Sequence, residues 1–291
     1  MYAWRFGPSD RMSSSSLSAR YRTAFITGAS TGLGLAFTEM LLKEGVSVWG
    51  TSRDQTRLPK LENFHPVELD LGEGAESERI FSAADRASGG FDLVINNAGF
   101  GAFGAFAHTD FAVWEEQFRV MLINTARLSQ VALRGMLARK RGALVNISSI
   151  AGEFGMPYQA TYNTVKAGLS ALNESLMYEL RGTGVIVIDF RPGDYRTDFE
   201  ASVRRPPQDR LLKKDTLSVA RMTRVWTSFV QMMESGPPPS HAAIALRRAL
   251  LRGRSCTVRT GRFFQAVLGP FLARFGSLQL RRRVQEKYFG L

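Results

Sequence analysis

A glycine-rich turn between a short strand and a helix is the feature that most restricts how this 291-residue chain can fold. Apolar residues 23–27 predict a strand, and the glycine-rich residues 28–34 follow it directly. Residues 35–44 predict a helix that ends at Gly45, and residues 46–50 predict a second strand. In this order of elements, backbone N–H groups and the helix N-terminus can approach a pyrophosphate closely. We therefore expect the turn to begin a dinucleotide-binding α/β fold.

The same alternation of strands and helices continues along the chain and predicts one doubly wound domain with a parallel sheet of about seven strands. Further strands are expected at 67–71, 91–95, 143–147, 185–190 and 255–260, with helices at 114–139, 160–180 and 241–251. The carboxyl ends of parallel strands lie at the same edge of a sheet, where ligands bind in such folds. The residues that follow each strand should therefore meet in one crevice.

Three segments differ in composition from the body of this domain, which we place at residues 21–260. Residues 1–20 are rich in serine and arginine and are expected to form a disordered leader. Residues 198–240 are polar and contain two groups of prolines, so we interpret them as a substrate lid with a helix near 216–233. Residues 261–291 form a basic and aromatic C-terminal extension.

The net charge of +12 belongs to the ends of the chain. Residues 21–246 hold 24 basic and 24 acidic residues, whereas residues 247–291 hold 11 basic residues and one acidic residue. A neutral body argues against a nucleic-acid-binding domain. The single cysteine, Cys256, excludes an internal disulfide and suits a reducing compartment such as the cytoplasm. No metal site is predicted, because the three histidines lie far apart and no acidic cluster lies beside them.

Tyr162 and Lys166 form the candidate catalytic pair, because they lie one turn apart on the same face of a predicted helix. A phenol is a poor acid or base at neutral pH, but a nearby cation favours the phenolate and lowers its pKa. A drop of about three units requires roughly 4 kcal/mol, which a buried ammonium and the positive ring of a cofactor could supply together. The spacing also fits an ordinary surface helix, so the prediction depends on motifs elsewhere in the chain.

The end of the second predicted strand indicates which cofactor the fold would bind. NAD enzymes of this architecture tend to carry an acid there, which binds the ribose 2′-hydroxyl. This chain has Thr51, Ser52 and Arg53 at that place, and an arginine can bind a 2′-phosphate. We therefore predict NADP(H) rather than NAD(H), with a solvated loop charge as the alternative reading of Arg53.

Taken together, these motifs resemble the short-chain dehydrogenase/reductase family over about residues 21–260. The matching elements are TGxxxGxG at 27–34, NNAG at 96–99, Asn124, Ser149, YxxxK at 162–166, and PG with a following threonine at 192–197. They occur in the order and at the spacing of the family. The resemblance implies a Rossmann-type doubly wound fold and an NAD(P)-dependent enzyme that interconverts a carbonyl and an alcohol.

The resemblance also implies a role for each matching residue. Tyr162 would be the general acid in reduction and the base in oxidation, while Lys166 would lower its pKa and hold the nicotinamide ribose. Ser149 would donate a hydrogen bond to the substrate oxygen, and Asn124 would position a water in a proton relay. Cofactor contacts are expected from Gly28, Ser30, Gly32, Leu33, Gly34, Ser52, Arg53, Asp70, Leu71, Asn97, Ala98, Gly99, Tyr162, Lys166, Pro192, Gly193 and Thr197.

Two regions stand apart from the core motifs of the family. Asp194 and Arg196 place charges in a loop that is often more apolar in the family. Residues 261–291 resemble, more loosely, the C-terminal segment of retinol- and hydroxysteroid-dehydrogenase-like members, which implies a bulky apolar alcohol or ketone as substrate. A basic and aromatic segment can contact an anionic membrane surface or form a helical flap over the substrate pocket, and the two readings are compatible.

Two other functions are compatible with parts of this pattern. One is an NAD-dependent alcohol dehydrogenase of the same family in which Arg53 is idle. The other is a non-catalytic NADP(H)-sensing protein, which would be expected to lack Tyr162, Lys166 or Ser149, although all three are present. The resemblance further implies a homodimer or homotetramer, formed through the helices at 114–139 and 160–180.

Overall fold

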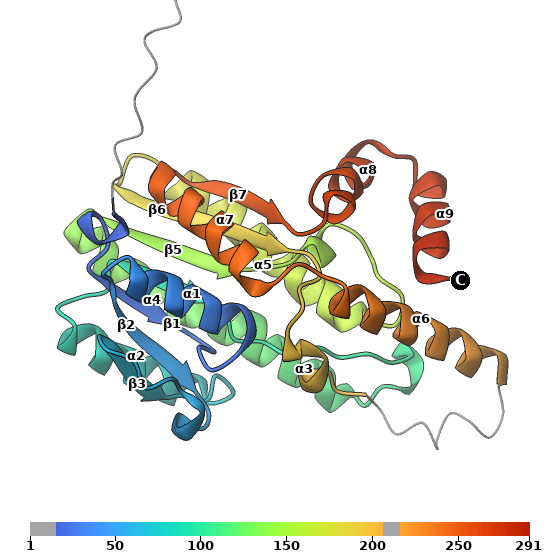
Figure 1. Cartoon of the computed structure of the whole chain (residues 1–291), viewed down its shortest axis with the longest axis horizontal. Coiled ribbons are helices and arrows are strands. Elements are labelled where there is room, and N and C mark those ends of the chain that lie inside the picture. Colours follow the sequence, from blue (N-terminus) through green and yellow to red (C-terminus); the bar gives the residue numbers. More distant parts are fainter. Residues whose placement is uncertain (1–15, 206–215) are drawn as a thin grey trace, which may run out of the picture.

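The computed structural model describes residues 16–205 and 216–291, and a seven-stranded parallel sheet runs through its centre (Figure 1). The strands are β1 (Thr23–Ile26), β2 (Ser47–Ser52), β3 (Phe64–Glu68), β4 (Leu93–Asn96), β5 (Gly142–Ile147), β6 (Val185–Pro192) and β7 (Cys256–Thr260). Their order in the sheet is β3-β2-β1-β4-β5-β6-β7. The strand order reverses between β1 and β4, which is where ligands bind in such sheets. The predicted doubly wound α/β fold with seven strands is confirmed.

Helices cover both faces of this sheet, which is why its inner strands read as continuous apolar runs. Ala24 and Ile26 of β1 face one layer of helices, while Phe25 between them faces the other. The first layer is formed by α1 (Gly32–Lys43) and α7 (Pro239–Arg252), and the second by α2 (Gly74–Ala87), α4 (Asn124–Arg139) and α5 (Ala160–Glu179) (Figure 1).

The remaining helices lie beyond the carboxyl ends of the strands. They are α3 (Phe111–Phe118), α6 (Thr216–Glu234), α8 (Gly269–Phe275) and α9 (Leu278–Phe289), and Figure 1 shows the last three gathered at one end of the molecule. A small cluster of buried apolar side chains, Phe103, Met222, Val225 and Phe289, joins α6 and α9 to the loop after β4. The C-terminal segment therefore packs against the end of the sheet where a ligand is expected.

Three elements differ from the predicted ones. The helix expected at 114–139 is interrupted by a π-helical turn at Arg119–Ile123, where the Thr125 hydroxyl donates to the Val120 carbonyl at 3.3 Å. The strand expected at 67–71 is β3, which begins and ends about three residues earlier, so Asp70 follows the strand rather than ending it. Helix α2, which lies between β3 and β4 in the chain, was not predicted from the sequence.

The fold begins earlier than residue 21. Leu17 is fully buried against the first helix layer, and the Arg20 side chain donates to the Leu251 carbonyl at 2.9 Å. The exclusion of residues 1–20 from the fold is therefore wrong for the described residues 16–20, because Leu17 contributes to the core. The rest of the predicted leader, residues 1–15, lies outside the described residues, as does 206–215 of the predicted lid.

Candidate active site

A pocket of about 830 Å³ opens at the carboxyl ends of the strands. All of the predicted site residues line it except Gly34 and Asn124. The residues that it brings together are Gly28, Ser30, Gly32, Leu33, Ser52, Arg53, Asp70, Leu71, Asn97, Ala98, Gly99, Ser149, Tyr162, Lys166, Pro192, Gly193 and Thr197. The pocket therefore joins the glycine-rich turn, the candidate catalytic pair and the loop after β6 in one continuous space.

The glycine-rich turn leaves the N-terminus of α1 open toward the pocket. Gly32 has a φ of +58°, which favours glycine, and Thr31 at the N-cap makes no side-chain capping bond. The first N–H groups of α1 thus remain available for an anion such as a pyrophosphate. Gly34 serves packing instead, because a Cβ atom on it would lie 2.0 Å from the Gly28 carbonyl oxygen.

Asn97 holds this turn against the end of β4. Its side-chain nitrogen donates to the Thr27 carbonyl at 3.0 Å and to the Gly28 carbonyl at 3.1 Å, and its backbone N–H donates to the Thr27 hydroxyl at 2.9 Å. The residue therefore positions the two loops that would enclose a cofactor, in addition to lining the pocket.

Ser149, Tyr162 and Lys166 converge on the pocket from β5 and α5. The Ser149 hydroxyl hydrogen-bonds to the Tyr162 phenol, and the Lys166 ammonium lies 5.6 Å from the centre of the Tyr162 ring. Lys166 is buried, and its Nζ donates to the Ile147 carbonyl at 2.7 Å. The predicted one-turn spacing in α5 thus places a proton donor and a cation beside the same hydroxyl.

The electrostatic state of this group differs from the expectation. Burial raises the pKa of Tyr162 to about 12, with the hydrogen bond to Ser149 acting against this and the charge of Asp194 adding to it. Burial also lowers the pKa of Lys166 to about 8, which the charge of Asp189 opposes. The effect of burial thus outweighs that of the Ser149 hydroxyl, and the Tyr162 phenol is protonated at neutral pH. A protonated phenol can donate its proton to the oxygen of a carbonyl group while that group is being reduced.

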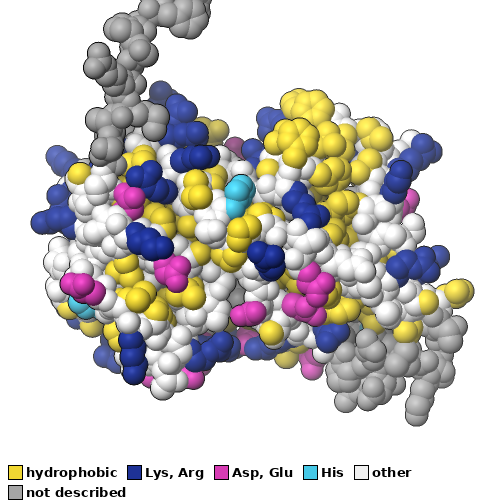
Figure 2. Space-filling view, viewed as in Figure 1, with side chains coloured by type: hydrophobic (Ala, Val, Ile, Leu, Met, Phe, Trp, Pro, Cys, Tyr) yellow, Lys and Arg dark blue, Asp and Glu magenta, His cyan; other side chains and the backbone are white. Residues whose placement is uncertain are grey.

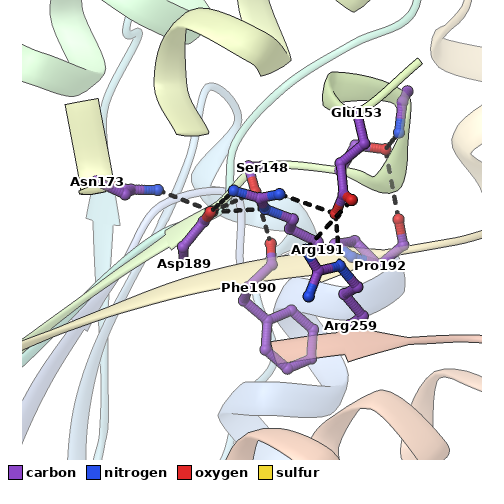
Figure 3. A network of polar contacts seen from close by, with 10 residues as sticks. Ser148, Glu153, Asn173, Asp189, Phe190, Arg191, Pro192 and Arg259 are labelled. Atoms are coloured by element: carbon purple, nitrogen blue, oxygen red, sulfur yellow. Dashed lines mark hydrogen bonds and ion pairs between the residues drawn. The ribbon is translucent and has the colours of Figure 1, made fainter. Parts of the chain in front are cut away.

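A buried polar ladder crosses the sheet beneath the site. Asn96, Asn146 and Asp189 occupy paired positions on β4, β5 and β6. The Asn96 amide donates to the Asn146 side-chain oxygen at 2.8 Å, and Asn173 of α5 donates to Asp189 at 3.0 Å. Ser148 donates to the same carboxylate, as Figure 3 shows. Because each bond joins a different element, the ladder fixes the loop that carries Ser149 relative to α5.

A chain of ion pairs extends this ladder to the edge of the sheet (Figure 3). Arg191 binds Asp189 at 2.6 Å and Glu153 at 2.8 Å, and Glu153 also binds Arg259 of β7 at 2.7 Å. Glu153 follows the 3₁₀ turn after Ser149, so these contacts hold that turn against β6 and β7. These ion pairs could not be predicted from the sequence, because they depend on which strands are neighbours in the sheet.

Asn124 lies behind the pocket rather than in its lining. Its side-chain nitrogen donates to the Leu71 carbonyl at 2.5 Å, and the residue is buried next to the π-helical turn. The side chain thus joins α4 to the loop after β3. A role for Asn124 in a proton relay remains a prediction, and its side-chain nitrogen already has this structural partner.

Two arginines line the part of the pocket expected to hold the adenosine ribose. Arg53 is exposed, and no ion pair with another described residue engages it. Asp54, the neighbouring acid, accepts bonds from the Thr56 N–H at 3.0 Å and the Thr56 hydroxyl at 2.6 Å. Arg57 also lines the pocket and was not predicted, although a second basic residue four positions after Arg53 was a visible signal in the sequence.

The C-terminal segment supplies a wall of the pocket that the sequence analysis did not assign to individual residues. This wall includes Phe264, Gln265, Leu272, Val284 and Tyr288. Gln265 donates a hydrogen bond to the Asp194 carboxylate. Burial nevertheless raises the pKa of Asp194 to about 6, although this hydrogen bond and the charge of Arg262 oppose the rise.

The raised pKa of Asp194 predicts a pH-dependent cost to stability. The folded state holds this proton more tightly than the unfolded chain, so ionisation as the pH rises from about 4 to above 6 lowers the free energy of unfolding by about 3 kcal/mol. Asp194→Asn should therefore be more stable than the native protein near pH 7 and equally stable near pH 4. Urea unfolding at both pH values measures this, with the exposed Asp198→Asn as control. A difference that does not change with pH would contradict it.

Comparison with known proteins agrees with this geometry. The family model for short chain dehydrogenases matches residues 22–208. An uncharacterized oxidoreductase of Myxococcus xanthus is 38% identical over 201 residues, which cover 64% of this chain and 77% of that protein. A short-chain dehydrogenase structure from Streptomyces avermitilis has a TM-score of 0.77 at 25% identity and covers 91% of this chain and 97% of that chain.

A second solved structure, of a mutant actinorhodin polyketide ketoreductase with NADPH, has a TM-score of 0.66 at 25% identity. It covers 81% of this chain and 95% of that chain. The residues matched by the family model, 22–208, span the glycine-rich turn, Ser149 and the pair Tyr162 and Lys166. The chain belongs to the short-chain dehydrogenase/reductase family of NAD(P)-dependent oxidoreductases.

Proposed function

We propose that this protein is an NADP(H)-dependent reductase that converts an apolar ketone or aldehyde to the alcohol, or catalyses the reverse reaction. The observation that carries the proposal is a single pocket with a protonated, serine-bound Tyr162 at one end and Arg53 with Arg57 at the other. The family supplies the oxidoreductase activity, while the cofactor preference and the substrate are the proposed part. Likeness to a ketoreductase solved with NADPH supports both.

The residues present fit such a cofactor. The N-terminus of α1 at Gly32 would hold the pyrophosphate, and Arg53 with Arg57 would bind the 2′-phosphate. When bound, the cofactor supplies the hydride. Ser149 donates a hydrogen bond to the carbonyl oxygen of the substrate, and Tyr162 gives its proton to the oxygen as charge develops there. Contact of Lys166 with the Ile147 carbonyl holds the ammonium beside the phenol.

An apolar substrate is proposed because of the side chains that line the pocket beyond Tyr162. They come from the segment after β6, from α6 and from the C-terminal helices, and include Phe199, Phe229, Met232, Phe264, Leu272 and Val284. Such a lining favours bulky apolar ligands, for which burial of each methylene contributes about 0.8 kcal/mol. A retinoid, a steroid or a lipid-like ketone would suit this wall.

The proposed function is tested by mixing the purified protein and NADPH with a panel of ketones, aldehydes, retinoids and steroids. We expect NADPH consumption that matches the alcohol formed from at least one apolar carbonyl compound. NADPH binding without turnover of any panel member would favour the cofactor-sensing alternative and contradict the proposal.

We also propose a homodimer or homotetramer, formed through α4 and α5. The support is the family resemblance together with large apolar side chains left exposed on this side of the molecule, namely Ile123, Leu137 and Tyr178. We propose that the protein is located in the cytoplasm. Its one cysteine, Cys256, is partly accessible and has no partner thiol in the sequence, which suits a reducing compartment.

A peripheral contact with an anionic membrane is a further part of the proposal. Across residues 16–205 and 216–291, no helix has both the length and the apolar character needed to cross a bilayer. The C-terminal segment nevertheless exposes a cluster of apolar side chains, which Figure 2 shows flanked by basic residues. The apolar members are Phe263, Val267, Leu268, Phe271, Phe275 and Leu278, and the exposed arginines are Arg262, Arg274, Arg282 and Arg283. The opposite side of the same helices lines the pocket.

Binding to vesicles tests this membrane contact. Each basic residue near an anionic surface contributes about 1 kcal/mol, so we expect salt-sensitive co-sedimentation with phosphatidylserine vesicles. Arg282→Glu with Arg283→Glu should weaken it by at least roughly tenfold. Point substitutions are preferable to truncation near residue 260, because truncation would remove Gln265 and Tyr288 from the pocket wall. Equal sedimentation without phosphatidylserine, or by the doubly substituted protein, would leave the segment as a flap alone.

A further inference from the structure

The side chain of Gln265 joins the C-terminal segment to the loop after β6 and is itself buried. Its Oε1 accepts a hydrogen bond from the Asp194 N–H at 3.1 Å. This bond fixes the orientation of the amide, because only the oxygen can accept it. The Nε2 atom then donates one hydrogen to Asp194 Oδ2 and the other to the Tyr288 hydroxyl oxygen at 3.0 Å.

Both hydrogens of the Gln265 amide are thus used, which leaves two polar groups with unused capacity. Tyr288 accepts from Gln265, so its own hydroxyl hydrogen points elsewhere, and no described residue accepts it. Asp194 Oδ1 receives no hydrogen bond from any residue in the described ranges. Both residues line the pocket. The wall therefore ends in one acceptor and one donor, set among apolar side chains.

We infer that Asp194 and Tyr288 recognise a hydroxyl group of the substrate, at a distance from the carbonyl group that Ser149 and Tyr162 bind. A hydroxyl is both a donor and an acceptor, so it can give its hydrogen to Asp194 Oδ1 and accept one from Tyr288. A substrate without this group leaves Asp194 Oδ1 and the Tyr288 hydroxyl hydrogen without a partner, which weakens its binding. The inference rests on the proposed carbonyl reduction for the other end of the substrate.

No charged neighbour in the described part of the chain forms an ion pair with the Asp194 carboxylate, so its Oδ1 atom is available to a ligand. The charged and titratable groups around it are Arg262, Tyr162 and Tyr288. The guanidinium of Arg262 donates to the Ser235 carbonyl and makes no ion pair with Asp194 within the described part of the chain. Phe264 stacks on the Tyr288 ring at 4.9 Å, which holds the hydroxyl in the apolar part of the pocket.

The nicotinamide carboxamide has the same donor and acceptor chemistry, so the experiment separates it from a substrate hydroxyl. Calorimetry of the Tyr162→Phe protein saturated with NADPH measures binding without turnover. The probes are pairs of apolar ketones that differ by one hydroxyl, placed one to several carbons from the carbonyl. We expect at least one hydroxy ketone to bind roughly ten- to a hundredfold more tightly than its partner. Adding Tyr288→Phe or Asp194→Ala should bring this ratio toward one.

The matched control is Tyr178→Phe, which removes a hydroxyl from an exposed tyrosine of α5 and should leave the ratio unchanged. If no hydroxy ketone binds more tightly than its partner, the inference is overturned. It is overturned equally if Tyr288→Phe weakens NADPH binding and leaves the ratio intact, because the pair then serves the cofactor. The proposed function is tested separately, by measuring whether the native protein reduces the ketones that lack the hydroxyl. A failure of the inferred hydroxyl recognition can therefore be distinguished from a failure of the proposed carbonyl reduction.

Discussion

Replacement of Tyr162 by phenylalanine is expected to lower kcat by roughly a hundred- to ten-thousandfold, because the proton donor for the carbonyl oxygen is lost. The ring remains and keeps its edge contact with Phe199, whose centroid lies 6.0 Å away. Affinity for NADPH should therefore stay within a few fold of the native value. Steady-state kinetics with the best carbonyl substrate and fluorescence titration with NADPH measure the two quantities.

The control for this experiment is again Tyr178→Phe, which makes the same change at an exposed position of the same helix. Its kcat should equal that of the native protein. Near-native turnover by Tyr162→Phe would remove Tyr162 from the mechanism and with it the assigned function of Ser149 and Lys166.

Arg53→Ala should weaken NADPH binding by roughly tenfold or more and leave NADH binding little changed. A hydrogen bond between charged groups contributes about 1.5–3 kcal/mol, and exposure of Arg53 places the effect toward the lower end. Because Arg57 lines the same wall, the variant with both arginines replaced should lose more than either single variant. The ratio of kcat/KM for NADPH and NADH measures the preference.

A suitable control is Arg254→Ala, which removes an exposed arginine near the amino end of β7, away from the pocket. It should leave the cofactor ratio unchanged. Equal kcat/KM for the two cofactors in the native protein would contradict the NADP(H) assignment and favour the NAD-dependent alternative in which Arg53 is idle.

The sheet could be predicted from the sequence where its strands are buried on both faces. Strands β1, β4 and β5 are almost wholly buried, so their residues form continuous apolar runs that stand out. The edge strand β3 exposes His65 and Pro66 and was misplaced because its pattern is polar. Helix α2 was missed for a similar reason, since it buries only Ser77 and Phe81.

Site residues whose arrangement depends on one helix could be predicted, whereas those that depend on long-range contacts could not. Tyr162 and Lys166 could be predicted because the helix alone sets their spacing. The contact of Gln265 with Asp194 spans 71 positions and depends on how the C-terminal segment folds back over the pocket, for which no local pattern exists. The ladder of Asn96, Asn146 and Asp189 likewise requires the register of three strands.

The most direct measurement of the central claim is the fate of the transferred hydrogen. The native protein is mixed with an apolar ketone and with NADPH in which both hydrogens on the nicotinamide carbon that gives up hydride are replaced by deuterium. We expect an alcohol with one deuterium on its carbinol carbon, formed roughly a hundred- to ten-thousandfold more slowly by Tyr162→Phe. An unlabelled alcohol, or labelled alcohol formed at the native rate by the variant, would contradict proton donation from Tyr162 coupled to hydride transfer in this pocket.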